Sequence, residues 1–240
     1  MKIFKINIAP LFWIILFCVC QNHAEAQFGA KLGTTISSFY YTDTEINPNI
    51  GYDIDLRPYV GYDIEWVQLG AQKPLVSYYF GAYYNFQFSN RFSFRPELGF
   101  SQKGVNFSQF EYEQIIYKIK ISYLEIPLSL AYQFIKRDKF VGDIYIGGFG
   151  DFKINAIKKL AYHNSTADKS KINSVKNFEA GIHLGLNFKY KIFEKFILFD
   201  FRIFQGLTDV FYMPDDQINL YYTTQKTKIT GFNLTLGYEF

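Results

Sequence analysis

The chain has 240 residues and a formal net charge of +3, from 25 basic and 22 acidic residues. This balance gives no support to a nucleic-acid partner or to attraction by an anionic surface, and the length suits one domain. Both cysteines, Cys18 and Cys20, lie in the first 26 residues, so the rest of the chain has no disulfide or thiol chemistry.

The first 26 residues have the pattern of a secretory signal peptide. A basic start and a short apolar run, too short to span a bilayer, lead to Ala-Glu-Ala before Gln27. A lipoprotein anchored at Cys18 or Cys20 is the alternative, but bulky residues precede both cysteines. Cleavage removes two lysines and one glutamate, which leaves a net charge of +2. We therefore predict a signal peptide at 1–26 and a single domain at 27–240.

Beyond the signal, large apolar residues alternate with glycine, polar or charged residues. A period of two indicates β-strands, because successive side chains leave opposite faces of the backbone. The pattern predicts about eight strands: residues 28–36, 78–88, 92–104, 118–134, 140–154, 178–190, 196–206 and 232–240.

The alternation fits two kinds of barrel. In a soluble, lipocalin-like barrel, Phe232, Leu234 and Leu236 would lie inside, and Asp200 and Arg202 would face water. In a membrane barrel the arrangement is inverted, with an apolar exterior and a polar interior. The chain has 27 Phe and 20 Tyr but no later apolar run long enough for a transmembrane helix, which favours the inverted barrel.

The connections alternate in length, as membrane barrels require. Tight turns at 89–91, 136–138 and 193–195 follow the second, fourth and sixth strands, and most other connections are long. We therefore expect periplasmic tight turns and extracellular long loops. The longest runs from residue 37 to about residue 74. The other long loops are expected at about 155–176 and 209–225.

The longest connection contains the sequence Gly-Tyr-Asp-Ile twice, at residues 51–54 and 61–64. We interpret the two copies as arms of an extra hairpin. Acidic residues within them suggest a cation only weakly, because no EF-hand spacing is present. These residues are Asp53, Asp55, Asp63 and Glu65.

Fourteen charged or titratable residues fall on the predicted inner face, and we interpret them as a structural lumenal network. They are Lys31, Arg95, Glu97, Lys103, Glu125, Asp143, Asp151, Lys153, Glu179, His183, Lys189, Asp200, Arg202 and Glu239. An eight-stranded barrel has an interior only wide enough for its own side chains, and buried charges must be paired. A narrow ion path is the alternative.

No catalytic, cofactor or metal residues are predicted. His183 with Glu179 and Asp200 suggests acid–base chemistry, but no serine is obviously placed as a nucleophile. One inward histidine does not supply the three or four clustered ligands that a metal needs.

Two further features concern the strands themselves. Pro96 and Pro127 cannot donate to a sheet ladder, so we expect β-bulges there. The chain ends on Phe240 in its last strand, which resembles the signal that delivers such barrels to their assembly machinery. Aromatic residues at strand ends suit interfacial girdles. These are Tyr78, Phe88, Phe92, Tyr132, Phe134, Tyr190 and Tyr238.

The segments FRPELGFSQKG at 94–104 and YLEIPLSLAY at 123–132 resemble the PorT-like outer-membrane β-barrel proteins of Bacteroidetes-type bacteria. The similarity extends over essentially the whole of residues 27–240. It implies an all-β fold, an antiparallel transmembrane barrel of about eight strands, OmpA/OmpX-like, in a Gram-negative outer membrane. It says little about function, although one branch of that family is implicated in protein secretion.

Together these features predict a non-enzymatic outer-membrane barrel with a charged, plugged lumen and extracellular loops for a binding or structural role. The alternatives are an accessory component of a secretion machinery and a small lipid-modifying enzyme, which needs a polar constellation on its lipid-facing surface. The expected partners are outer-membrane lipid, the barrel assembly machinery through the C-terminal strand, and a protein at the extracellular loops. No nucleic acid is expected.

Overall fold

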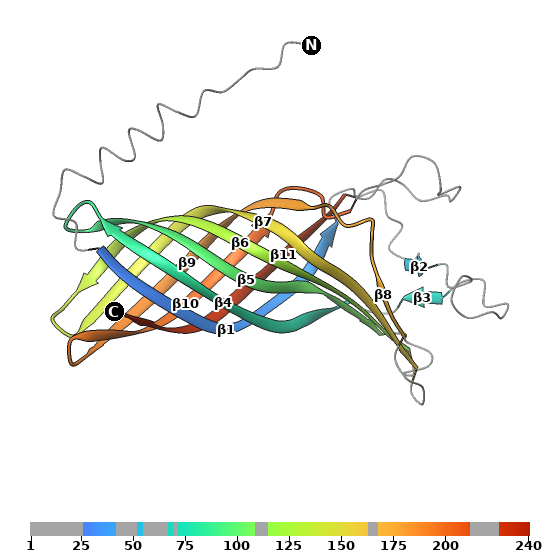
Figure 1. The fold of residues 1–240 in the computed structure, drawn as a ribbon, viewed down its shortest axis with the longest axis horizontal. Coiled ribbons are helices and arrows are strands. Elements are labelled where there is room, and N and C mark those ends of the chain that lie inside the picture. Colours follow the sequence, from blue (N-terminus) through green and yellow to red (C-terminus); the bar gives the residue numbers. More distant parts are fainter. Residues whose placement is uncertain are drawn as a thin grey trace, which may run out of the picture.

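Eight long antiparallel strands close into one barrel, as predicted (Figure 1). The computed structural model describes residues 26–41, 52–54, 67–69, 72–108, 115–162, 168–211 and 226–240. The barrel strands are β1 (Ala26–Tyr41), β4 (Gln72–Gln87), β5 (Phe92–Ser108), β6 (Ile115–Lys136), β7 (Phe140–Tyr162), β9 (Phe178–Ile192), β10 (Lys195–Gly206) and β11 (Thr227–Glu239). Each pairs with the next, and pairing of β1 with β11 closes the barrel. Within the described ranges no helix is long and apolar enough to cross a membrane.

The outer surface is apolar and the interior is polar. Leu32, Ile146 and Leu236 are 69%, 63% and 59% exposed, whereas Lys31 and Asp200 are 4% and 0% exposed. Charged residues inside and large apolar residues outside are the arrangement of a barrel that sits in lipid. The lipocalin-like alternative is wrong, because it requires the opposite orientation of these side chains.

The tight turns and the described ends of the chain lie at one end of the barrel. Residues 88–91, 137–139 and 193–194 connect adjacent strands there, and Phe193 adopts a φ of 56°. The Phe240 amide donates to the Phe28 carbonyl at 2.8 Å, so the last strand ends beside the start of β1. These tight turns form the end that we expect from the sequence to be periplasmic, and the long loops form the end that we expect to be extracellular.

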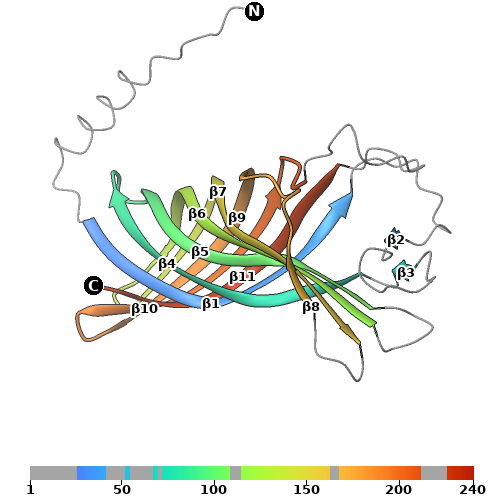
Figure 2. The same cartoon turned by 45° about the vertical axis from the view of Figure 1, so that its right-hand side comes forward.

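β6 and β7 extend furthest at the long-loop end, and β5 pairs with β6 there as far as Ser108 (Figure 2). β6 has 22 residues and β7 has 23, about twice the length needed to cross a bilayer. The short strand β8 (Asp168–Lys171) pairs with the far part of β7. The loop predicted from residue 155 is therefore wrong in its first part, because pairing with β6 keeps the chain extended to Tyr162.

The loop predicted at 37–74 is also shorter than expected. β1 continues to Tyr41 because it goes on pairing with β11, and β4 begins at Gln72 because it already pairs with β5 there. The loop contains a small hairpin of β2 (Tyr52–Ile54) and β3 (Val67–Leu69). Its first arm is the predicted one, but its second arm is β3 and not residues 61–64, which lie outside the described residues.

The two strand prolines are accommodated without bulges, contrary to prediction. Pro96 and Pro127 lie where pairing is interrupted for two positions, and the register is the same on either side of each gap. The register shifts in these strands lie elsewhere: between Pro74 and Tyr79 on β4, and between Ser122 and Tyr123 and between Gln133 and Ile135 on β6. Each proline thus interrupts the pairing with one neighbouring strand only. Pairing with the other neighbouring strand continues and keeps the proline in register.

Candidate functional site

The barrel interior holds the predicted charged residues. Thirteen of the fourteen side chains belong to residues that are at most 4% exposed, and Lys153 is half-buried. They come from seven of the eight barrel strands, because each strand turns every second residue inward, and β4 contributes the buried Tyr79 and Tyr83 instead of a charge. The Lys153 ammonium donates to the carbonyl of Val175 in the connection that follows β8.

The level of ion pairs nearest the tight turns is built from four strands. The Lys189 ammonium lies 2.9 Å from Glu239 Oε2 and 3.8 Å from Asp143 Oδ2. On the other side of Asp143, Arg95 Nη2 lies 3.3 Å from Oδ2. Tyr83 donates its hydroxyl hydrogen to Glu239 at 2.9 Å. Two cations and one tyrosine therefore hold two carboxylates.

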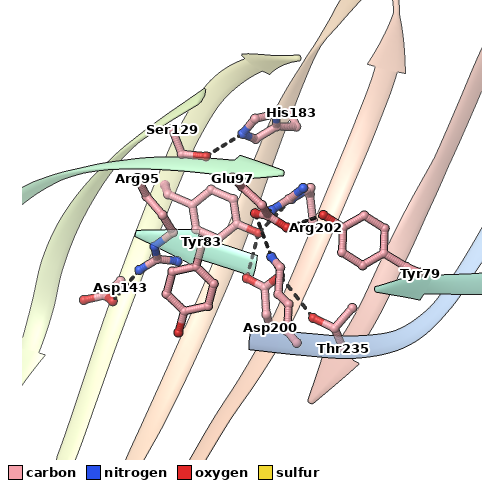
Figure 3. Close-up of polar contacts among 12 residues, drawn as sticks. Tyr79, Tyr83, Arg95, Glu97, Ser129, Asp143, His183, Asp200, Arg202 and Thr235 are labelled. Atoms are coloured by element: carbon pink, nitrogen blue, oxygen red, sulfur yellow. Dashed lines mark hydrogen bonds and ion pairs between the residues drawn. The ribbon is translucent and has the colours of Figure 1, made fainter. Parts of the chain in front are cut away.

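The middle level is the most densely connected one (Figure 3). The Lys31 ammonium lies 3.0 Å from Glu97 Oε2 and 2.9 Å from Asp200 Oδ2. Arg202 Nη2 lies 2.5 Å from the same Glu97 oxygen. Tyr145 donates to Asp200 at 2.8 Å, and a second tyrosine, Tyr79, donates to Glu97. Each of these carboxylates therefore meets at least two donors.

The third level is nearest the long loops and is organised by one lysine. The Lys103 ammonium lies 2.6 Å from Asp151 and 3.2 Å from Glu125. Its other side is covered by aromatic rings, with the centroids of Phe149 and Phe204 at 4.6 and 4.4 Å. This contact with the ring faces is favourable for a desolvated cation. The level thus joins the charged interior to an apolar layer beyond it.

That apolar layer caps the interior at the long-loop end and was not anticipated from the sequence. Its core includes Val105 and Phe107 of β5, Ile121 of β6 and Ile229 of β11, all of which are buried. Two connections cross it: a β-bridge joins Val175 to Phe211, and the Lys176 amide donates to the Val210 carbonyl at 2.7 Å. The sequence signal for this layer was that the inward positions near the strand ends, such as Val105 and Ile121, are apolar and not charged.

Inward tyrosines fill the space that inward glycines leave, a second feature that the sequence reasoning missed. A Cβ atom at Gly29 would lie 2.3 Å from the Tyr83 ring, and one at Gly185 would lie 2.2 Å from the Tyr145 ring. The rings therefore lie directly on the glycine backbones of neighbouring strands. Seven carboxylates face five cations among the buried residues, and the tyrosine hydroxyls supply additional donors.

A serine does lie beside the inward histidine, which corrects the sequence-based statement that none was placed there. Ser129 Oγ lies 2.8 Å from His183 Nε2, and the two residues are 1% and 3% exposed. Among the described residues His183 Nδ1 has no hydrogen-bond partner, so no carboxylate orients the ring as in a catalytic triad. Neither Glu179 nor Asp200 takes that place.

Two observations bear on ligands. A polar cavity of about 290 Å³ at the tight-turn end is lined by Asp143, Lys189 and Glu239, so the first level of ion pairs forms its floor. In the part of the chain that the structure describes, no three His, Cys, Asp or Glu side chains are grouped to hold a metal ion. Of the acidic residues proposed in the long loop, Asp55, Asp63 and Glu65 lie outside the described residues.

Residues 21–212 match the family model described as outer membrane protein beta-barrel domain. The chain belongs to this family. The match covers most of the chain, and it agrees with the apolar exterior and the charged interior of the barrel. No curated protein sequence matches the chain.

Solved structures that resemble this outer-membrane barrel share little sequence with it. The outer membrane protein OprG from Pseudomonas aeruginosa is 12% identical with a TM-score of 0.46, and 92% of this chain and 98% of that chain are covered. Neisserial surface protein A is 10% identical with a TM-score of 0.40, and 89% of this chain and 97% of that chain are covered. Ail, the attachment invasion locus protein of Yersinia pestis, is 11% identical with a TM-score of 0.38, and 90% of this chain and 99% of that chain are covered. Membership of the outer-membrane barrel family rests on the match to the family model and not on these structures.

Proposed function

We propose that this protein is a non-enzymatic outer-membrane barrel whose filled interior makes it a rigid scaffold for its extracellular segments. The observation that supports this most directly is the series of closed levels along the barrel axis. Three levels of ion pairs are followed by an apolar layer that two connections cross. Among the described residues, such an interior leaves an ion or solute no continuous polar path.

Conductance measurements in planar lipid bilayers test this proposal. We expect no steady conductance from the purified barrel. A variant with the four substitutions K31S, E97S, D200S and R202S removes only the middle level with no change in formal charge, and we expect it to stay closed because the other two levels and the apolar layer remain. A folded barrel gives a heat-modifiable band on SDS gels, which is the control. Steady conductance by the unmodified protein contradicts the proposal.

The extracellular segments are proposed to contact a protein partner. Support comes from the length of β6 and β7, which carry a three-stranded extension well past the bilayer. The PorT-like resemblance of residues 94–104 and 123–132 makes an accessory role in a secretion machinery the finer proposal. Affinity purification from crosslinked cells of the native host tests it, and recovery of the barrel alone argues against it.

A lipid-modifying activity is the alternative that the Ser129–His183 pair raises. Both side chains face the interior, and the histidine lacks an orienting carboxylate among the described residues. We therefore propose that the pair is part of the interior packing. The purified protein is expected to release no fatty acid from outer-membrane lipids, and the variant S129A is expected to behave like the unmodified protein.

A further inference from the structure

The extension formed by β6, β7 and β8 carries five lysines on one face, here called the lysine patch: Lys118, Lys120, Lys159, Lys169 and Lys171. Lys118 lies opposite Lys159, which lies opposite Lys169 on the next strand. One step along, Lys120 and Lys171 flank Ile157 in the same way. Residues directly opposite one another on neighbouring strands project on the same face, so the five ammonium groups share one surface.

The lysine patch faces outward, toward the surroundings of the barrel. On β6 its lysines alternate with Ile119 and Ile121, which are 9% and 0% exposed and belong to the apolar layer inside. Lys169 and Lys171 are exposed, and the other three are half-buried. The patch therefore does not contribute to the interior network.

The lysine patch lies just beyond the apolar belt of the barrel. Among the β6 residues whose side chains are described, Leu124 is the large exposed apolar residue nearest the long-loop end, and Lys120 is four residues closer to that end. With a rise of ~3.3 Å per residue and a strand tilt of ~40°, Lys120 is roughly 10 Å above that edge. The polar headgroup layer on each side of a bilayer is ~5–7 Å thick, and lysine side chains extend toward it. The lower row of the patch is thus within reach of headgroup phosphates.

Nothing within the described ranges neutralises these charges. None of the five ammonium groups forms an ion pair with a described acidic side chain. Partial burial, together with the positive charges of Lys118, Lys159 and Lys169, lowers the pKa of Lys120 from its ordinary value. Like charges opposite one another destabilise a sheet, so the arrangement is understandable if an anion binds there.

We propose that the lysine patch binds the phosphate groups of lipid headgroups in the outer leaflet that surrounds the barrel. Its place at the membrane edge and its outward direction favour a lipid over a soluble polyanion. Headgroup phosphates offset the repulsion among the lysines and hold the extension against the membrane surface. This inference is independent of the proposed scaffold role, because it concerns the outer face and not the interior.

The experiment compares two variants of the full-length barrel purified in a neutral detergent. The patch variant carries K118Q, K120Q, K159Q and K169Q. The control variant carries K136Q, K139Q, K191Q and K195Q, which removes the same charge at the tight-turn end. Bound lipid A, a bisphosphorylated glycolipid, is counted by native mass spectrometry and titrated to obtain an affinity. Heat-modifiable mobility shows that each variant is folded.

We expect the patch variant to lose at least about tenfold in affinity for lipid A, since each lysine near an anionic headgroup contributes roughly fivefold. The control variant should lose less than about threefold. Equal losses in both variants overturn the proposal, because they reflect net charge alone. Inorganic polyphosphate is the second probe: if it binds the unmodified barrel more tightly than lipid A and is lost in the patch variant, the patch serves a soluble polyanion and the lipid proposal is wrong.

Discussion

Arg202 Nη2 lies 2.5 Å from Glu97 Oε2, although the two residues are 105 positions apart in the sequence. Both are fully enclosed, and Lys31 approaches the same carboxylate oxygen at 3.0 Å. Five strands therefore meet at the middle level: β1, β5 and β10 through the charged residues, and β4 and β7 through the tyrosines that donate to Glu97 and Asp200. A change to one partner leaves a charge without its counterion in a place that water does not reach.

Replacement of Glu97 by Gln is expected to lower the free energy of unfolding by about 3–5 kcal/mol, because a buried charge loses its partner. The double variant E97Q/R202M should be less destabilised than E97Q, since both charges are gone. The matched control is Asp209→Asn, which removes a half-exposed pair with Lys176 at 3.8 Å and should cost less than ~1 kcal/mol. Urea unfolding in lipid vesicles measures all three. Similar values for E97Q and D209N would contradict the assigned burial.

Gly185→Ala is expected to destabilise the barrel by about 1–3 kcal/mol, because the added methyl group collides with the Tyr145 ring. Gly148→Ala is the matched control, as the nearest atom to a Cβ there is a carbonyl oxygen at 3.5 Å. It should be close to neutral. The same unfolding measurement distinguishes the two, and equal effects would show that the tyrosine does not lie on the glycine.

Leu128→Arg places a charge on the outward face of β6 within the apolar belt. We expect a loss of ~2–4 kcal/mol, the cost of a cation near the bilayer midplane. Asn155→Arg, beyond the belt on β7, should cost ~0–1 kcal/mol. Folding yield into vesicles and urea unfolding report both. A larger cost for Asn155→Arg than for Leu128→Arg would show that the membrane surrounds a different part of the barrel. The position assigned to the lysine patch would then be wrong.

Phe240→Ser is expected to reduce the amount of barrel that reaches the outer membrane, if the C-terminal strand is the part that the assembly machinery binds. Phe240 is 57% exposed and stacks on Phe28 at a centroid distance of 5.9 Å. The control is Phe193→Ser, which removes a 94% exposed ring from a tight turn. Fractionation of cells and gels of unheated and boiled membranes give the folded fraction. Unchanged assembly of the Phe240 variant refutes the role.

The sequence by itself determined which strand residues share a face of the wall and where the tight turns fall. Both properties are local: alternation along a strand sets the direction of a side chain, and short polar runs such as residues 89–91 specify a turn. Alternation places Lys31, Asp200 and Arg202 on the face opposite the large apolar residues, and the high aromatic content without a long apolar run favours that charged face as the interior.

Only the tertiary structure decided which charges meet. Closure of β1 on β11 and the tilt of the strands set the level of each inward residue, so Glu97 meets Arg202 and Lys103 meets Asp151. The extension has the same origin, since β6 and β7 remain strands past the membrane because they pair with each other. The rows of lysines on that extension exist only in this register, which alternation within a single strand does not specify.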